Sequence, residues 1–158
     1  EGTFEIPEDT SGEMSQTISL TASSATAWDG ESKTEPEQVD GVYQISTGAE
    51  LYWFENEVNV NKKGDINALL TADINLAGYS WTPIGTSGAI YMGSFDGQGH
   101  TISNLYQNDI GYSGIFGQAG ARISSLTVEG TIIMSTSGCG IPVSGNHRCT
   151  GKSNRLYI

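Results

Sequence analysis

Apolar residues recur with the period of an α-helix in one segment of the first half of the chain. Leu51, Phe54 and Val58 stand three and four positions apart, which places them on one face of a helix. Tyr52 and Trp53 widen that face. The pattern predicts an amphipathic helix with its apolar side turned toward a core.

Polar residues mark both ends of this helix. Thr47 is followed three positions later by Glu50, a pair whose side chains can each accept a hydrogen bond from the other residue's backbone N–H. The Asn-Lys-Lys-Gly turn at 61–64 ends the periodic run. We therefore expect the helix to occupy residues 47–59.

Other segments alternate apolar and polar residues with the period of a β-strand. Residues 42–45 form a short strand pattern just before the helix, and residues 70–76 alternate from Leu70 to Leu76. Residues 81–85 form another short unit, bounded by turn residues. The pattern predicts one strand over 42–45 and one over 70–76.

The composition favours short strands and turns over helices. The 158 residues include 21 Gly, 18 Ser and 15 Thr, about a third of the chain. Gly loses much backbone entropy in a helix, and Ser and Thr hydrogen-bond to nearby backbone in non-helical conformations. We expect a mainly β fold with many turns.

A repeat at an offset of 21 residues indicates a solenoid. The matching pairs are Phe95 with Phe116, Ile102 with Ile123, Ser103 with Ser124, and Leu105 with Leu126. A repeat of this length suits one turn of a short β-rich coil. The sequence therefore predicts a parallel β-helix in which the three apolar pairs stack on each other.

The acidic charge lies almost entirely in the N-terminal part. The formal net charge is -11, and residues 1–60 contain 13 acidic residues and 1 basic residue. A polyanion would be repelled, so nucleic acid is not expected as a partner. We also expect no membrane insertion of this module, since no run of 18 apolar residues occurs.

Shifts in composition predict three regions. Residues 1–27 form an acidic leader that is partly disordered or contains one strand, residues 28–138 form the β-helix module, and residues 139–158 form a divergent basic tail. The tail is expected to be an irregular or non-native end. The alternative is a degenerate final coil closed by a Cys139–Cys149 disulfide, which an oxidising compartment would allow.

The sequence predicts no catalytic, cofactor-binding or metal-binding residues. Glycoside hydrolysis needs a pair of carboxylates, whereas Asp73 and Asp96 are expected to lie on the surface and at a corner. His100 has no Ser or Cys nucleophile near it in sequence and is interpreted as a packing or hydrogen-bonding residue. The two His and two Cys residues lack zinc-site spacing.

Aromatic residues crowd the region that follows the second strand pattern. They are Tyr79, Trp81, Tyr91, Tyr106 and Tyr112. Flat rings can stack on sugar faces, and an adhesive protein could use them in this way. The other interpretation, which we favour for Trp81 and Tyr91, is that the rings pack against the coil or its loops.

Five segments resemble, in order, motifs of the GLUG-motif family of bacterial surface and secreted proteins. They are residues 41–51, 70–76, 81–85, 95–105 and 114–117. Gly114–Gly117 resembles the GLUG motif itself, with Ile115 where leucine is usual. The resemblance covers residues 28–134 and implies a fold similar to the right-handed parallel β-helix of pectate lyases, with an N-terminal capping α-helix at 47–59.

The resemblance implies a function in binding or support. We expect a non-catalytic module of a bacterial cell-surface or secreted protein, acting in adhesion or as a rigid spacer. Its partner would be a host or cell-wall glycan or a surface protein, and further β-helix coils or domains would follow in the full-length protein. The alternatives are the N-terminal part of a carbohydrate-active β-helix enzyme (lyase or glycosidase) and an accessory domain of a secreted peptidase.

Overall fold

The fold consists mainly of strands, with one helix. The computed structural model describes residues 25–108, 114–133 and 156–157. Its elements are β1 (Glu37–Val39), β2 (Val42–Ile45), α2 (Gly48–Asn59), β3 (Asn67–Leu70), β4 (Ile74–Asn75), β5 (Ser94–Asp96), β6 (Thr101–Asn108), β7 (Arg122–Ser124), β8 (Thr127–Ile133) and β9 (Leu156–Tyr157).

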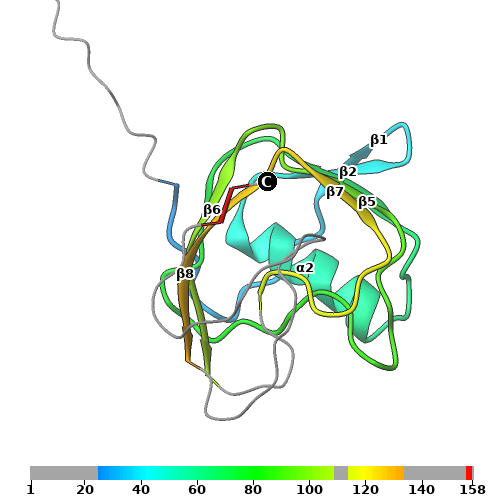
Figure 1. Cartoon of the computed structure of the whole chain (residues 1–158). Coiled ribbons are helices and arrows are strands. Elements are labelled where there is room, and N and C mark those ends of the chain that lie inside the picture. Colours follow the sequence, from blue (N-terminus) through cyan, green and yellow to red (C-terminus); the bar gives the residue numbers. More distant parts are fainter. Residues whose placement is uncertain (1–24, 109–113, 134–155, 158) are drawn as a thin grey trace, which may run out of the picture.

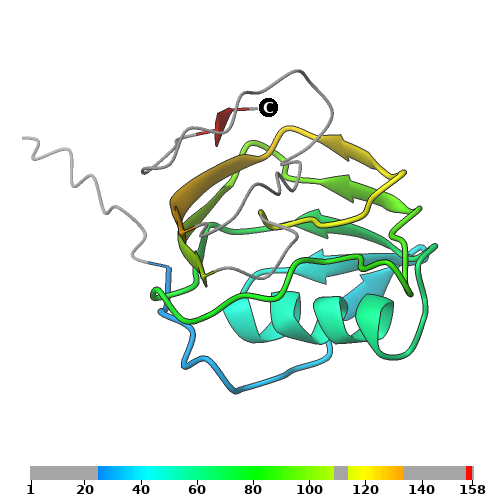
Figure 2. The same cartoon turned by 60° about the horizontal axis from the view of Figure 1, so that its bottom comes forward.

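The strands form two sheets that grow together, layer by layer. One sheet has the order β1-β2-β3-β5-β7 and the other β4-β6-β8-β9. All neighbouring strands are parallel except the β1–β2 and β8–β9 pairs. Figure 2 shows the layers from the side, from the cyan strands next to the helix to the orange β8.

The predicted helix is confirmed with its cap. Helix α2 begins after Thr47, whose hydroxyl accepts a hydrogen bond from the Glu50 N–H at 3.2 Å, and the Glu50 carboxylate accepts from the Thr47 N–H at 3.0 Å. Leu51, Phe54 and Val58 are fully buried. Figures 1 and 2 together show that α2 spans the space enclosed by the strands and lies at one end of the stack.

The strand predicted over residues 42–45 is confirmed as β2, whereas the strand predicted over 70–76 is two strands with a corner between them. Leu70 ends β3 and Ile74 begins β4, and both side chains are buried, as is that of Leu76. The chain turns around the core at this corner. Alternation therefore continues across the bend, because both arms point apolar residues to the same interior.

The predicted stacking at an offset of 21 residues is wrong for its three apolar pairs, Phe95 on Phe116, Ile102 on Ile123 and Leu105 on Leu126. The observed partners of Phe95, Ile102 and Leu105 are Ile123, Val128 and Gly130. Phe95 and Phe116 belong to different sides of the fold and meet inside it, with ring centroids 5.1 Å apart. The offset matched two different sides of the fold, since each side points apolar residues inward.

The observed repeat is longer and is marked by corners in the left-handed conformation. Ala77 and Asn104 both have φ of 55°, and Gln98 and Ser125 both have φ of 51°. The members of each pair stand 27 positions apart, the same separation as the paired residues Ala68 and Phe95. A positive φ is uncommon for residues other than glycine, so its recurrence marks equivalent corners in successive layers.

Four aromatic rings form a closed cluster in the core. Phe54 of α2 contacts Tyr91 and Phe95 with ring centroids 5.7 and 5.9 Å apart, and Phe116 contacts the same two rings at 5.7 and 5.1 Å. Edge-on and offset aromatic pairs at these separations are favourable beyond the area that they bury. The cluster therefore joins the helix to the strand layers.

One edge strand of each sheet, β1 or β9, runs antiparallel to its neighbour. The β1–β2 turn consists of Asp40 and Gly41, with φ of 50° and 82°, as in the turns that suit the twist of a hairpin. At the other end, Leu156–Tyr157 pairs antiparallel with β8. The pairing of β9 with β8 is therefore opposite in direction to the parallel pairing of β8 with β6.

Several predictions fall outside the described residues. They concern the leader up to residue 24, most of the tail, and the Cys139–Cys149 disulfide. Ala27, which is described, pairs parallel with Asn75. Strand pairing on this side therefore begins one residue before the predicted module boundary at 28.

Candidate functional site

Asp73 and His100 lie together at a corner between two layers. The Asp73 Oδ1 atom accepts a hydrogen bond from the Thr101 N–H at 2.9 Å and lies 3.2 Å from His100 Nδ1. Asp73 is exposed, as predicted, but it also holds the start of β6 beside β4. His100 is a hydrogen-bonding residue, as the sequence indicated.

Asp96 stabilises the next corner. Its Oδ1 accepts a hydrogen bond from the Gln98 N–H at 3.0 Å, and its Oδ2 accepts from the Gln98 side-chain amide. Gln98 has the left-handed backbone conformation, and a carboxylate that bonds to backbone two residues onward is a common way to stabilise such turns. The predicted structural role of Asp96 is confirmed.

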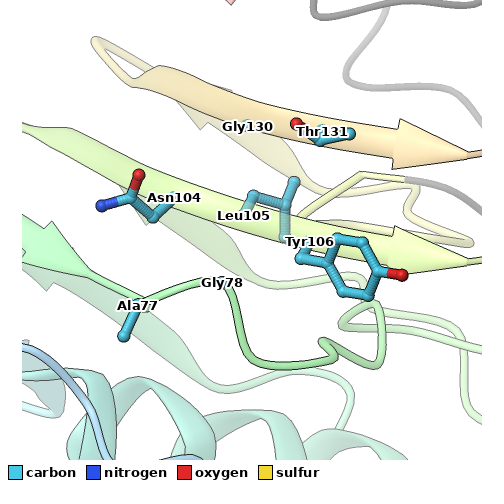
Figure 3. Close-up of a pocket in the computed structure, with 7 residues that line it drawn as sticks. All are labelled: Ala77, Gly78, Asn104, Leu105, Tyr106, Gly130 and Thr131. Carbon is cyan, nitrogen blue, oxygen red and sulfur yellow. The ribbon is translucent and has the colours of Figure 1, made fainter.

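A shallow groove runs along the outer side of β6, as Figure 3 shows. Its volume is about 170 Å³, and it is lined by Ala77, Gly78, Asn104, Leu105, Tyr106, Gly130 and Thr131. A break in the register between β6 and β8 lies here, between Ile102 and Leu105. The groove is therefore built where the two strands bulge.

Gly130 is needed at this bulge. It pairs with Leu105, and a Cβ atom at Gly130 would overlap the Leu105 carbonyl oxygen and Cβ. Asn104 has φ of 55°, and its amide donates to Asn75 Oδ1 at 2.8 Å. The absence of a side chain at Gly130 lets β6 and β8 approach closely, and the Asn104 amide joins β6 to β4 beside the groove.

The groove offers hydrogen-bonding groups and one aromatic ring. Asn104, Tyr106 and Thr131 carry its side-chain polar atoms. The seven lining residues include no carboxylate, imidazole, thiol or amine. This arrangement can contact a polar ligand, but the lining residues provide no acid–base pair.

The structure separates the aromatic residues that the sequence grouped together. Trp81 and Tyr91 are buried, as predicted, and the Tyr91 hydroxyl donates to the Ser94 carbonyl at 2.7 Å. Tyr79 is 48% exposed, and Tyr106 is half-buried at the groove. Tyr112 lies outside the described residues.

A buried polar cluster at the end of α2 was not predicted. Asn59 Nδ2 donates to Glu55 Oε1 at 2.5 Å and to the Pro83 carbonyl at 2.8 Å, and the Gly85 N–H donates to Asn59 Oδ1 at 2.8 Å. Glu55 is only 4% exposed. The signal was present in the sequence, because positions 55 and 59 follow Leu51 at four-residue intervals and so lie on the apolar face.

The carboxylates of Glu55 and Glu57 have opposite environments. Burial raises the pKa of Glu55 above its ordinary value, against hydrogen bonds from Asn59 and Asn56 and the charge of Lys33. Burial also acts to raise the pKa of Glu57. The Lys63 Nζ atom, 2.5 Å from Glu57 Oε2, and the hydrogen bond from Asn61 outweigh burial and hold the pKa of Glu57 below its ordinary value. Glu57 is therefore the more strongly ionised of the two.

Within the described residues, no three His, Cys, Asp or Glu side chains lie close enough together to hold a metal ion. No helix in this part of the chain is long and apolar enough to cross a membrane. No family model, no curated protein and no solved structure matches the chain.

Proposed function

We propose that the chain is a rigid, non-catalytic module of a bacterial cell-surface or secreted protein, built as the helix-capped end of a right-handed parallel β-helix. The observation that carries this proposal is the parallel pairing of successive layers in both sheets. Paired residues stand 25 to 28 positions apart, as in Val42 with Asn67 and Phe95 with Ile123. Right-handed connections between parallel strands are strongly preferred, which supports the proposed hand.

The position of α2 supports the capping role. Phe54 contacts the rings of Tyr91 and Phe95, so the helix covers apolar side chains that would otherwise be exposed at the end of the stack. Unpaired coil ends invite edge-to-edge association. A cap at one end directs growth to the other end, where further coils of a longer protein would add to β7, while the outer edge of β8 already pairs with β9.

The contacts of the acidic side chains favour a structural role over a catalytic one. Asp73 and Asp96 accept backbone hydrogen bonds at corners, and Glu50 caps α2. The groove beside β6 offers no carboxylate or imidazole among its lining residues. Asp73, Asp96 and Glu50 therefore stabilise corners and a helix end of the fold, as expected of side chains in a scaffold.

The resemblance to GLUG-motif proteins supports the proposed setting at the cell surface or outside the cell. The GLUG-like segment pairs with a buried residue of the preceding layer, since the Ile84 N–H donates to the Ile115 carbonyl at 2.8 Å and the Gly117 N–H donates to the Ile84 carbonyl at 2.9 Å. These backbone hydrogen bonds join successive layers. A motif that joins layers in this way is expected in an extended scaffold, which supports the proposed setting.

Polysaccharide turnover tests the non-catalytic part of the proposal. The full chain is incubated with a panel of plant, algal and bacterial polysaccharides, and new reducing ends and unsaturated uronates are measured. We expect no release above that of the buffer. Turnover that disappears in Asp73→Asn and His100→Gln variants, and persists in a Lys62→Gln control, would favour the carbohydrate-active alternative.

Hydrogen exchange tests the rigid scaffold. We expect the amides of β3, β5 and β6 to exchange only through global unfolding, because they lie in the interior of parallel sheets. Exchange of these strands as fast as that of the exposed turn at Ser87 and Gly88 would contradict a rigid stack.

Adhesion to a glycan is a second candidate function, favoured by the groove beside β6. Tyr106 offers an aromatic ring, and Asn104 and Thr131 offer hydrogen-bonding groups, which together suit a sugar. A glycan array probed with the full chain tests this function. Binding that is lost in Thr131→Ala and Tyr106→Ala, and kept in Tyr79→Ala, would support it, whereas the absence of any bound glycan would leave the spacer role.

A further inference from the structure

Three side chains with complementary chemistry meet between the segment before β1 and helix α2. The Lys33 Nζ atom donates a hydrogen bond to Asn56 Oδ1 at 3.1 Å. The Asn56 Nδ2 atom in turn donates to Glu55 Oε2 at 3.0 Å. An amine thus lies at the carbonyl side of a carboxamide, and a carboxyl group lies at its nitrogen.

We propose that Lys33 and Asn56 form an intramolecular isopeptide bond, with Glu55 transferring the proton. The Lys33 Nζ–Asn56 Cγ bond forms and the Asn56 Cγ–Nδ2 bond breaks. Lys33 attacks as the neutral amine, after its ammonium has lost a proton to the solvent. Glu55 gives its proton to the leaving nitrogen and takes one from the attacking nitrogen, so an amine and a carboxamide give a secondary amide and ammonia without an oxidant or a reductant. The cross-link is a covalent modification independent of the proposed function.

The hydrogen bond to the carbonyl oxygen keeps the lysine amine close to the amide carbon. Since the carbonyl bond is about 1.2 Å long, Lys33 Nζ is no farther than about 4.3 Å from Asn56 Cγ. Reacting groups held near van der Waals contact gain large rate advantages over the same groups free in solution. A rotation at the end of the lysine side chain completes the approach.

The backbone around Lys33 is held against the helix. The Thr34 N–H donates to the Ala49 carbonyl in the first turn of α2 at 3.2 Å, and Trp28 Nε1 donates to the Ser32 carbonyl at 2.9 Å. Asp29 accepts hydrogen bonds from the Glu31 and Ser32 N–H groups. Lys33 therefore meets Asn56 from a fixed segment and not from a free strand of chain.

Glu55 is placed to act on the leaving nitrogen. Its Oε2 contacts Asn56 Nδ2, the atom that must leave as ammonia, while its Oε1 is held by Asn59. Burial raises the pKa of Glu55 above its ordinary value, which favours the protonated form that can donate a proton. A positioned acid of this kind typically accelerates proton-coupled reactions by about 10² to 10⁴.

A second lysine–asparagine–glutamate group, formed by Glu57 of the same helix with Asn61 and Lys63 beyond its end, provides an internal comparison. Lys63 Nζ contacts the Glu57 carboxylate directly, and Asn61 Nδ2 donates to the other oxygen of that carboxylate. Here the carboxylate holds both the amine and the amide nitrogen. The geometry therefore selects Lys33 and Asn56, and Lys63 is the matched control.

Mass spectrometry of the purified full chain tests the bond. After incubation in mildly alkaline buffer, we expect an intact mass lower than the sequence mass by one ammonia. A tryptic digest should contain a branched peptide that joins position 33 to position 56. The Lys33→Met and Asn56→Ala variants should each have the intact mass calculated from their own sequence. The Lys63→Met variant should show the same loss of one ammonia as the natural chain.

The Glu55→Gln variant separates the proposed role of the carboxyl group from simple proximity. With a native circular dichroism spectrum, it should form the branched peptide about 10² times more slowly than the natural chain. An unchanged intact mass of the natural chain after prolonged incubation would overturn the proposal. So would an ammonia loss that persists in Lys33→Met, which would come from an asparagine succinimide instead.

Discussion

Replacing Phe116 by alanine tests whether the aromatic cluster holds the layers and the helix together. The Phe116 ring is 2% exposed and contacts Tyr91 and Phe95 at centroid distances of 5.7 and 5.1 Å. Truncation of a buried phenylalanine typically costs about 3–5 kcal/mol, because both the transfer free energy and the contacts around the cavity are lost. This cost is a large part of the total stability of about 5–15 kcal/mol that is usual for a domain.

The corresponding fall in melting temperature is about 12–20 °C, at about 4 °C for each kcal/mol in a domain of this size. Thermal and urea unfolding followed by circular dichroism measure it. Met92→Ala is the control, because Met92 is 60% exposed and its truncation should change stability by no more than about 0.5 kcal/mol. A cost for Phe116→Ala below about 1.5 kcal/mol, or equal to that of the control, would refute the placement of this ring in the core.

Three further substitutions test local contacts by the same unfolding measurements. Thr47→Ala removes the helix cap and should cost about 0.5–2 kcal/mol, whereas Thr47→Ser should retain most of it. Gln107→Leu should cost about 1–3 kcal/mol, because the buried Gln107 amide bonds the Trp81 and Gly114 carbonyls and the Gly114 N–H; a neutral result would contradict that network. Since the folded pKa of Glu57 lies below 4.5, its stabilisation is present above that pH and is lost as the pH falls through the lowered value. Glu57→Gln should therefore lower the melting temperature at neutral pH and leave it nearly unchanged in acid, and an equal effect at both pH values would contradict the ion pair with Lys63.

The helix and its cap could be predicted from the sequence because they depend on near neighbours. The bond between Thr47 and Glu50 spans three residues, and the apolar face of Leu51, Phe54 and Val58 follows from the helical period alone. The mainly β character followed in the same way from composition and alternation. Such features hold wherever the segment is placed in a fold.

The register of the strands could not be read from the same pattern. Every side of the fold turns apolar residues inward, so Phe95 and Phe116 resemble each other in sequence although they lie on different sides. The true repeat depends on how many residues each corner consumes. That number is set by contacts across layers, such as the Thr101 N–H bond to Asp73.

Sequence patterns thus define the segments that form helix and strand, while the partners of the polar side chains come only from the tertiary structure. Asn59 meets the Pro83 carbonyl, and Lys33 meets Asn56, across more than twenty positions of chain. No local period places these atoms together. They meet because the fold brings distant segments to one end of the parallel layers. There, burial and hydrogen bonding decide which groups pair, and proximity in the sequence does not.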